Sequence, residues 1–362
     1  MKFPALLLLS LCVSSFGLQA DVFSWRNGGN GLYPEATTPI DWNHEELVLW
    51  KSSTPDWANA CPILVGDKLF YTVEPADLVC ADARTGEVLW TRSNAYEDVY
   101  DMPESERQIL KKKLGGDQNQ DAEIKALQKK VYNLTRRQRN DTSNERLNAQ
   151  LEAAQKELAD LEEKAGAIPE KFIKPRTHNT NGHASMTPCS DGKYVYTGNN
   201  LGIIVKYDLD GNRIWARIME RPDHNWGASV SPQLIEGKLI VRFSDYAALD
   251  PETGEELWRV KDPQTFGTPA TFQVEGQAFL YTVRGELIRV SDGKKLPSQD
   301  WTIDELPFAF FNTPFVKGNR VYVVHGAAGL QGDVYCMEIP QKLEELNRKG
   351  LKQIWHTEAS KE

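Results

Sequence analysis

Three short segments of the sequence combine histidine, asparagine and tryptophan, each a few residues ahead of a proline. The candidate ligand-binding residues are Trp57 and Asn59 in the first segment, His178, Asn181 and His183 in the second, and His224, Asn225 and Trp226 in the third. Imidazole and amide groups exchange hydrogen bonds, and an indole offers a flat apolar face for stacking. If the fold gathers the segments, they predict a site for a polar ligand or a peptide. Alternatively, these side chains only satisfy water and strand ends.

Familiar catalytic motifs are absent or broken. Residues 29–34 lack the third glycine of the dinucleotide-binding pattern, and His44 is followed by two glutamates but by no second histidine four residues on. No P-loop and no G-x-S-x-G elbow occurs. The cysteines after residue 20 are too widely spaced for a C-x-x-C motif: Cys61, Cys80, Cys189 and Cys336. The sequence therefore indicates no catalytic and no metal-binding residue, and it favours a protein that is not an enzyme.

One motif recurs along the chain, so we expect a repeated structural unit to position the three segments. Residues 248–258 read Ala-Leu-Asp-Pro-Glu-Thr-Gly-Glu-Glu-Leu-Trp, and residues 80–90 match them at the Asp, the Thr-Gly and the Trp. Weaker copies lie at residues 207–215, 289–296 and 351–355. In register with this motif, a proline precedes a glycine and an alternating apolar run at Pro62 and Gly66, Pro188 and Gly192, Pro232 and Gly237, Pro269 and Gly276, and Pro314 and Gly318. Trp215 and Trp258 lie 43 residues apart, which is the length of a four-stranded propeller blade.

Five tryptophans end these units, and we expect them to be structural. They are Trp50, Trp90, Trp215, Trp258 and Trp355. A blade has two faces to cover, and a large flat side chain between neighbouring blades fills the gap. The five indoles are therefore predicted to pack between blades rather than to bind a ligand.

The same assignment places Cys61 and Cys80 on the first and third strands of one blade. Two strand spacings separate them, about 9–10 Å. This exceeds the reach of a disulfide, so we expect buried free thiols.

The repeats define the fold class and the domains. We expect an all-β protein, a β-propeller of about five four-stranded antiparallel blades with an inserted helical hairpin. The predicted parts are a signal peptide at 1–20, an N-terminal segment with an orphan blade strand and blade 1 at 21–102, the hairpin at 103–172, and blades 2–5 at 173–362. Residues 46–50 copy a last strand with no first three strands before them. We therefore expect an incomplete ring of seven or eight blades, completed by further C-terminal blades or from outside this chain.

Residues 103–172 lack the glycine turns of the blades and follow helical spacing instead. Apolar residues recur at Ile124, Leu127, Val131 and Leu134, and again at Leu147, Leu151, Ala154, Leu158 and Leu161. The spacing predicts an antiparallel, coiled-coil-like hairpin that turns at residues 140–144. Basic clusters at 111–113 and 136–139 indicate either a solvated helix face or an arm that docks a partner.

The first twenty residues have the form of a secretory signal peptide, with Lys2, an apolar run at 5–13 and small residues up to Ala20. A lipid anchor on Cys12 is the alternative, which Leu11 before it disfavours. No later run reaches the roughly 20 apolar residues of a transmembrane helix. We therefore expect a periplasmic or secreted protein, and a peripheral place at the outer membrane stays open. The net charge of −9 argues against a nucleic-acid partner.

The tryptophan motif resembles that of a known repeat family. Residues 248–258, and residues 23–31 followed by 47–51, are similar to the PQQ-like (pyrroloquinoline-quinone-like) β-propeller repeats of exported bacterial proteins. That family includes the propeller lipoprotein of the outer-membrane β-barrel assembly machinery. The resemblance implies a non-catalytic module that binds or scaffolds a protein, peptide or glycan.

The family also includes quinoprotein alcohol dehydrogenases. The resemblance to them implies the alternative function, a dehydrogenase or its relic that uses PQQ with calcium. Those enzymes carry adjacent cysteines, a calcium-binding Glu and Asn, and an Asp base. No residues of this sequence match that set, so no cofactor is expected.

Overall fold

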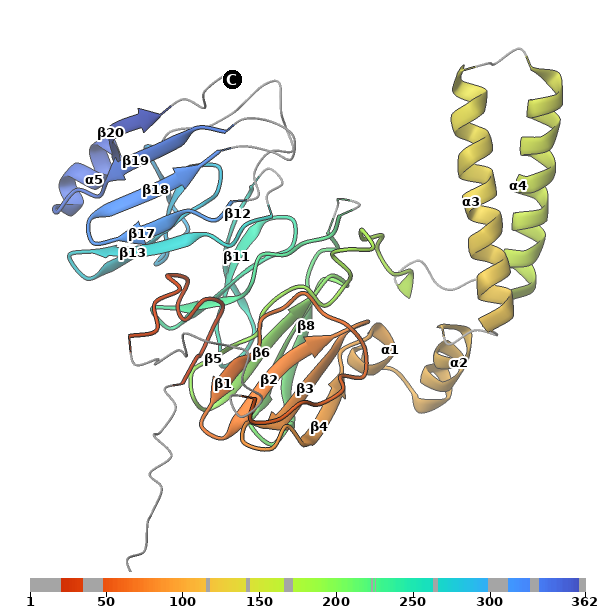
Figure 1. Cartoon of the computed structure of the whole chain (residues 1–362), viewed down its shortest axis with the longest axis horizontal. Coiled ribbons are helices and arrows are strands. Elements are labelled where there is room, and N and C mark those ends of the chain that lie inside the picture. Colours follow the sequence, from red (N-terminus) through yellow and green to blue (C-terminus); the bar gives the residue numbers. More distant parts are fainter. Residues whose placement is uncertain are drawn as a thin grey trace, which may run out of the picture.

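The computed structural model contains five four-stranded antiparallel sheets, as the repeat predicted (Figure 1). The structure describes residues 21–34, 48–114, 118–140, 144–165, 172–222, 224, 226–262, 266–298, 312–325 and 332–357. The predicted signal peptide and Cys12 lie outside these residues. Each sheet is a meander in chain order, and turns with a positive-φ glycine connect many of the consecutive strands.

The five sheets are the blades, numbered along the chain. Blade 1 holds β1 (Ile63–Val65), β2 (Lys68–Val73), β3 (Asp77–Asp82) and β4 (Val88–Ser93), and blade 2 holds β5 (Cys189–Ser190), β6 (Tyr194–Asn199), β7 (Ile203–Asp208) and β8 (Arg213–Ile218). Blade 3 holds β9 (Gln233–Ile235), β10 (Lys238–Arg242), β11 (Tyr246–Leu249) and β12 (Glu256–Val260). Blade 4 holds β13 (Ala270–Val274), β14 (Gln277–Tyr281), β15 (Leu287–Arg289) and β16 (Lys295–Leu296), and blade 5 holds β17 (Phe315–Lys317), β18 (Arg320–Val324), β19 (Val334–Glu338) and β20 (Lys352–Thr357).

Neighbouring blades pack face to face through apolar side chains. Between blades 1 and 2, the buried Phe70 and Leu78 belong to one cluster with Val205 and Tyr207. Comparable clusters join blades 2 and 3, blades 3 and 4, and blades 4 and 5. Because each blade covers one face of the next, the core is a series of interfaces rather than one central mass.

The docking tryptophans lie against glycines of the following blade. The indole of Trp90 covers Gly211, where an added Cβ would lie 2.8 Å from the ring, and its Nε1 donates to the carbonyl of Leu209 at 3.2 Å. Three further pairs repeat this contact: Trp50 on Gly86, Trp215 on Gly254, and Trp258 on Gly293. Trp355 of the fifth blade is 43% exposed. Only a residue without a Cβ fits beneath these rings.

The orphan strand predicted at residues 46–50 is not seen where the structure describes it. Residues 48–50 form no strand, although Trp50 donates from Nε1 to the carbonyl of Ala83 at 2.9 Å. No strand among the described residues is paired with this segment. The described blades therefore form an arc, with blade 1 at one end and blade 5 at the other (Figure 1).

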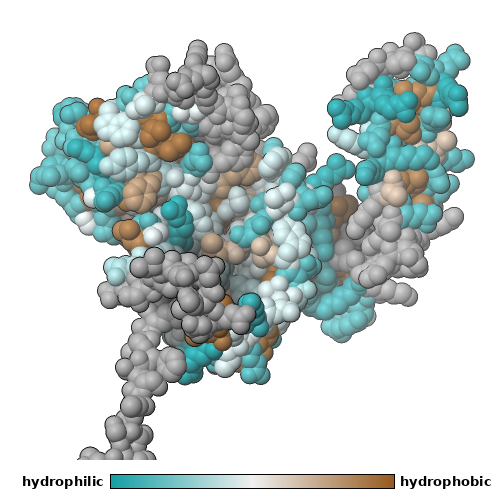
Figure 2. Space-filling model, in the orientation of Figure 1, coloured by the Kyte–Doolittle hydropathy of each residue, from teal (hydrophilic) through white to brown (hydrophobic). Residues whose placement is uncertain are grey.

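The described helices between blades 1 and 2 are α1 (Tyr96–Val99), α2 (Glu104–Leu114), α3 (Gln118–Asn140) and α4 (Glu145–Ala165). Tyr96 of α1 and Leu110 of α2 are buried in the apolar cluster of blades 1 and 2, whereas α3 and α4 stand apart from the sheets (Figure 1). Helices α3 and α4 pack on each other through Val131, Leu134, Leu147, Leu151 and Ala154, and their outer surfaces are largely hydrophilic (Figure 2). The break between them falls where the sequence predicted the turn. None of the described helices is long and apolar enough to cross a membrane.

Two further details differ from the sequence prediction. Helix α5 (Leu343–Lys349) connects β19 to β20, in the place of the Thr-Gly turn of the other blades. Cys61 is exposed and precedes β1 instead of lying on it, because the strand begins only after Pro62. All four described cysteines are free, and burial raises the pKa of the Cys80 thiol to about 12.

Candidate functional site

The loops that carry the candidate residues are held together by a belt of hydrogen bonds around the innermost strands. The backbone N–H of Cys61 donates to Oγ1 of Thr187 at 3.0 Å, that of Thr187 donates to Oγ of Ser231 at 3.1 Å, and that of Ser231 donates to Oγ1 of Thr268 at 3.1 Å. Each of these residues directly precedes the proline of its blade. The belt therefore sets where the loops ahead of β1, β5 and β9 leave the blades, and we call the rim formed by these loops the channel mouth.

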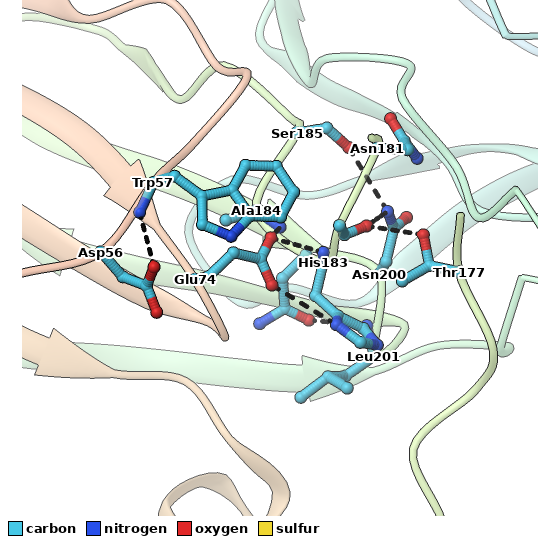
Figure 3. Close-up of polar contacts among 12 residues, drawn as sticks. Asp56, Trp57, Glu74, Thr177, Asn181, His183, Ala184, Ser185, Asn200 and Leu201 are labelled. Atoms are coloured by element: carbon cyan, nitrogen blue, oxygen red, sulfur yellow. Dashed lines mark hydrogen bonds and ion pairs between the residues drawn. The ribbon is translucent and has the colours of Figure 1, made fainter. Parts of the chain in front are cut away.

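A polar residue after the second strand of a blade holds the loop ahead of the next blade (Figure 3). Glu74 follows β2, and its Oε1 accepts the backbone N–H groups of His183 at 2.6 Å and Ala184 at 2.7 Å. Asn200 follows β6, and its Oδ1 accepts the backbone N–H of Ala228 at 2.7 Å. Glu74 and Asn200 are therefore equivalent anchors, one for each of two neighbouring loops.

Asn200 also bonds to the second loop, the one ahead of β5. Its Nδ2 donates to the carbonyl of Gly182 at 2.7 Å, and Oγ1 of Thr177 donates to the same carbonyl at 2.8 Å. These bonds are buried or partly buried, where an unpaired polar group would be costly. The loop is therefore held by several hydrogen bonds within the chain itself.

Four of the predicted site residues line one pocket. Asn59, His178, Asn181 and Trp226 surround a space of about 200 Å³, together with Thr180, Ser229 and Phe266. The imidazole of His178 stacks on the indole of Trp226, with ring centres 4.4 Å apart and an interplanar angle of 13°. The pocket therefore has an aromatic wall.

Hydrogen bonds join the three loops around this pocket. Nδ2 of Asn59 donates to the carbonyl of Thr180, and Nδ2 of Asn181 donates to the carbonyl of Trp226 at 2.6 Å. The loop ahead of β1 is thus bonded to the loop ahead of β5, which is itself bonded to the loop ahead of β9. The described lining side chains include no Asp, Glu, Lys or Arg, so this part of the wall has no fixed charge.

His224 and Phe266 extend the aromatic wall. The ring of His224 meets Phe266 edge to face at 5.6 Å, and its Nδ1 accepts the backbone N–H of Trp226 at 3.1 Å. Phe266 comes from the loop ahead of blade 4 and lies 6.4 Å from Trp226, between ring centres. Asn225 lies outside the described residues.

Trp57 and His183 do not line this pocket. The indole of Trp57 packs on Gly182, where an added Cβ would lie 2.7 Å from the ring, and it borders a separate space of about 430 Å³ beside blade 1. The side chain of His183 is mostly buried, with Nδ1 3.5 Å from Oε2 of Glu74 and Nε2 3.1 Å from the carbonyl of Pro175. Both side chains hold the second loop in place, and neither is open to a ligand at the pocket.

The sequence analysis missed the anchors and the belt. Glu74 and Asn200 directly follow the observed strands β2 and β6, and Thr187, Ser231 and Thr268 each precede a repeat proline. A hydroxyl at the same register in three repeats was a usable signal for the belt. No such signal marked Glu74, because its partners lie more than a hundred residues away.

The described residues of the channel mouth do not fit PQQ with calcium. Calcium requires several oxygen ligands, chiefly carboxylates, and the carboxylates of PQQ require cationic partners. The pocket wall offers neither, and Oε1 of Glu74 already accepts two backbone N–H groups. Among the described residues, no cluster of three His, Cys, Asp or Glu side chains could hold a metal ion.

The end of the channel opposite the mouth is covered by the N-terminal segment. Val22 pairs with Leu64 of β1, and the carbonyl of Phe23 accepts the backbone N–H of Ser190 at 2.8 Å. Oδ1 of Asp21 accepts the N–H of Gly66, in the turn after β1, at 2.7 Å.

Five stacked meander sheets with a shared tryptophan–glycine contact define a β-propeller. Residues 242–362 match the family model described as outer membrane protein assembly factor BamB. Over these residues the chain is therefore similar to the PQQ-like β-propeller repeats of BamB, as the tryptophan motif indicated. No curated protein matches the chain.

Three solved structures resemble the chain. BamB from Moraxella catarrhalis is 11% identical, with a TM-score of 0.46 over 86% of this chain and 67% of that one. Quinohemoprotein alcohol dehydrogenase from Comamonas testosteroni is 17% identical, with a TM-score of 0.35 over 51% of this chain and 35% of that one. Quinohemoprotein alcohol dehydrogenase ADHIIG from Pseudomonas putida HK5 is 10% identical, with a TM-score of 0.37 over 92% and 61%. The chain thus spans less than two thirds of either dehydrogenase.

Proposed function

We propose that this protein is an exported, non-catalytic β-propeller that binds a protein, peptide or glycan at the channel mouth and acts as a binding or scaffold module. The observation that supports this most is the bonding of three loops around one pocket, from Asn59 to the second loop and from Asn181 to Trp226. Preformed, mostly apolar concavities with a few fixed polar groups are typical of binding sites.

The family match supports the same proposal. BamB is described as an outer membrane protein assembly factor, so a protein partner and a periplasmic place, peripheral to the outer membrane, fit a relative of it. The predicted signal peptide agrees with export. A repeat fold that holds several loops along one rim suits such a role.

Site-specific photo-crosslinking tests this proposal. Benzoylphenylalanine replaces His178 at the pocket, and in a control chain it replaces Thr91, an exposed residue on the outermost strand of blade 1. After irradiation in the exporting cell, we expect one discrete adduct from position 178, lost when Asn181→Ala is added. No adduct at 178, or the same adduct from position 91, would count against a binding site at the mouth.

A further inference from the structure

We propose that the pocket at the channel mouth takes a neutral sugar ring, so that the ligand of this protein is an uncharged glycan. The inference rests on the proposed function and specifies its ligand. It depends on the size of the pocket, the chemistry of its wall, its lack of charge and its rigidity.

The size of the pocket fits one ring. Its volume is about 200 Å³, whereas an apolar cavity of about 150 Å³ holds a benzene molecule. A single six-membered ring with its substituents therefore fits. A folded peptide segment does not enter it.

The wall offers both surfaces that a sugar ring requires. The indole of Trp226 is 46% exposed and is supported by the stacked ring of His178 and by Phe266. A flat C–H face of a pyranose packs on such a ring and removes apolar surface from water. The amides of Asn59 and Asn181 and the hydroxyls of Thr180 and Ser229 stand around it.

These polar groups favour a sugar over an aromatic or prolyl side chain. Nδ2 of Asn59 donates to the carbonyls of Thr180 and Asn181, Nδ2 of Asn181 donates to the carbonyl of Trp226, and no described residue bonds either Oδ1. A hydrocarbon ring in the pocket would strip water from these oxygens and replace none of their bonds, at about 1–3 kcal/mol each. Hydroxyl groups restore those bonds, so a polyhydroxylated ring loses less on entry.

The charge of the pocket selects neutral sugars. None of the seven lining residues that the structure describes is Asp, Glu, Lys or Arg. A uronate or phosphorylated sugar would lose water without gaining an opposite charge, which is unfavourable for an ion. An uncharged hexose or N-acetylhexosamine carries no such cost.

Rigidity makes this small site usable. The bonds from Asn59 and Asn181 and the anchors Glu74 and Asn200 hold the three loops before binding. Little conformational entropy is then lost when a ligand enters. A single ring can bind measurably, and repeated units of a glycan would add contacts along the mouth.

The test is titration calorimetry of the full chain with defined sugars. The probes are cellobiose, maltose and N,N′-diacetylchitobiose as neutral disaccharides, digalacturonic acid as a charged one, and a proline-rich peptide. We expect at least one neutral disaccharide to bind saturably, and digalacturonic acid to bind at least tenfold more weakly. Trp226→Ala and Asn181→Ala should each lower the affinity at least tenfold.

Variants that preserve the fold guard this test. Trp226→Phe keeps an aromatic wall and should weaken binding less than Trp226→Ala, and it replaces the alanine variant if that one unfolds. Tyr132→Ala changes a side chain that is 64% exposed on α3 and should not alter affinity.

Three results would overturn the inference: no neutral disaccharide binds, binding persists unchanged in the Asn181→Ala and Trp226→Phe chains, or only the peptide binds. An adduct at position 178 together with blank sugar titrations would refute the glycan and leave the proposed binding function standing. Failure of both experiments would refute both.

Discussion

Gly211 illustrates how single residues fix the distance between blades. It adopts a φ of +82°, and the indole of Trp90 leaves no room for a Cβ. Gly237 has a similar φ of +68° in a turn with open space around it. Substituting each glycine in turn therefore separates the free-energy cost of backbone strain from the cost of displacing the tryptophan.

Gly211→Ala should lower the free energy of unfolding by about 2–4 kcal/mol, since it combines backbone strain with an overpacked interface. Gly237→Ala is the matched control and should cost about 1–2 kcal/mol from strain alone. Urea denaturation followed by tryptophan fluorescence measures both. Equal losses in the two variants would mean that the tryptophan contact contributes nothing.

His325 gives the protein a pH-dependent stability. Burial lowers the pKa of His325 from 6.5 to about 4, and the charge of Asp333 opposes this only in part. The unfolded chain therefore binds a proton at a higher pH than the folded chain does. The stability contributed by neutral His325 is complete above pH 6.5 and is lost as the pH falls towards 4.

The loss should be no more than about 3 kcal/mol between pH 7 and pH 4. Replacing His325 by Gln removes the titrating group, so the variant should lose less stability than the natural chain over the same interval. Denaturation midpoints at several pH values provide the measurement. Parallel pH profiles for the two chains would contradict the role of His325.

At the scale of elements, the hairpin of α3 and α4 has an apolar cluster of its own. Leu151 is 5% exposed and packs with Leu134, Leu147 and Ala154, whereas the blades are held by separate clusters. Residues 118–165 contain no tryptophan. Tryptophan fluorescence therefore reports on the blades, and circular dichroism at 222 nm reports mainly on the helices.

Leu151→Ala should lower the melting temperature of the helical signal, at a cost of about 2–4 kcal/mol, and leave the fluorescence transition unchanged. Leu239→Ala, within the interface of blades 2 and 3, is the comparison and should lower the fluorescence transition instead. If Leu151→Ala shifted both signals together, the hairpin and the blades would form one cooperative unit.

Which elements could be predicted depended on the range of the interactions. The blades followed from the spacing of Trp, Gly and Pro, because each blade is built from contacts within about forty residues. Helix α5 was missed, since its seven residues stand where the other copies have a short turn. The strand expected at residues 46–50 needed a neighbour that the sequence could not supply.

The candidate site was predictable only in part for the same reason. Asn59, Asn181 and Trp226 were predicted from residue type and position within the repeat, and the structure brings them to one pocket. The sequence could not show that Trp57 and His183 lie outside this pocket. Their positions depend on contacts with Gly182 and Glu74, which are more than a hundred residues away in the chain. The equivalence of Glu74 and Asn200 needed the structure.

At the scale of the whole molecule, the five blades form an arc and the hairpin of α3 and α4 stands apart from it (Figure 1). The alternative function, a quinoprotein dehydrogenase, would involve the whole ring of blades, because the cofactor would lie in the central channel. Incubation of the full chain with PQQ and Ca²⁺, followed by gel filtration, should leave no stoichiometric quinone absorption on the protein. A retained band at one equivalent would reverse the assignment to a binding module.

The central claim is that ligands bind at Trp226 while the docking tryptophans stay in place. Indole N–H signals of the chain labelled with ¹⁵N-tryptophan test it most directly, with the Trp226 signal assigned by its loss in Trp226→Phe. On saturation with the best neutral disaccharide, that signal should move, while the signals of Trp90, Trp215 and Trp258, each hydrogen-bonded to a carbonyl of the next blade, stay fixed. A stationary Trp226 signal, or equal movement of the docking tryptophans, would contradict the account.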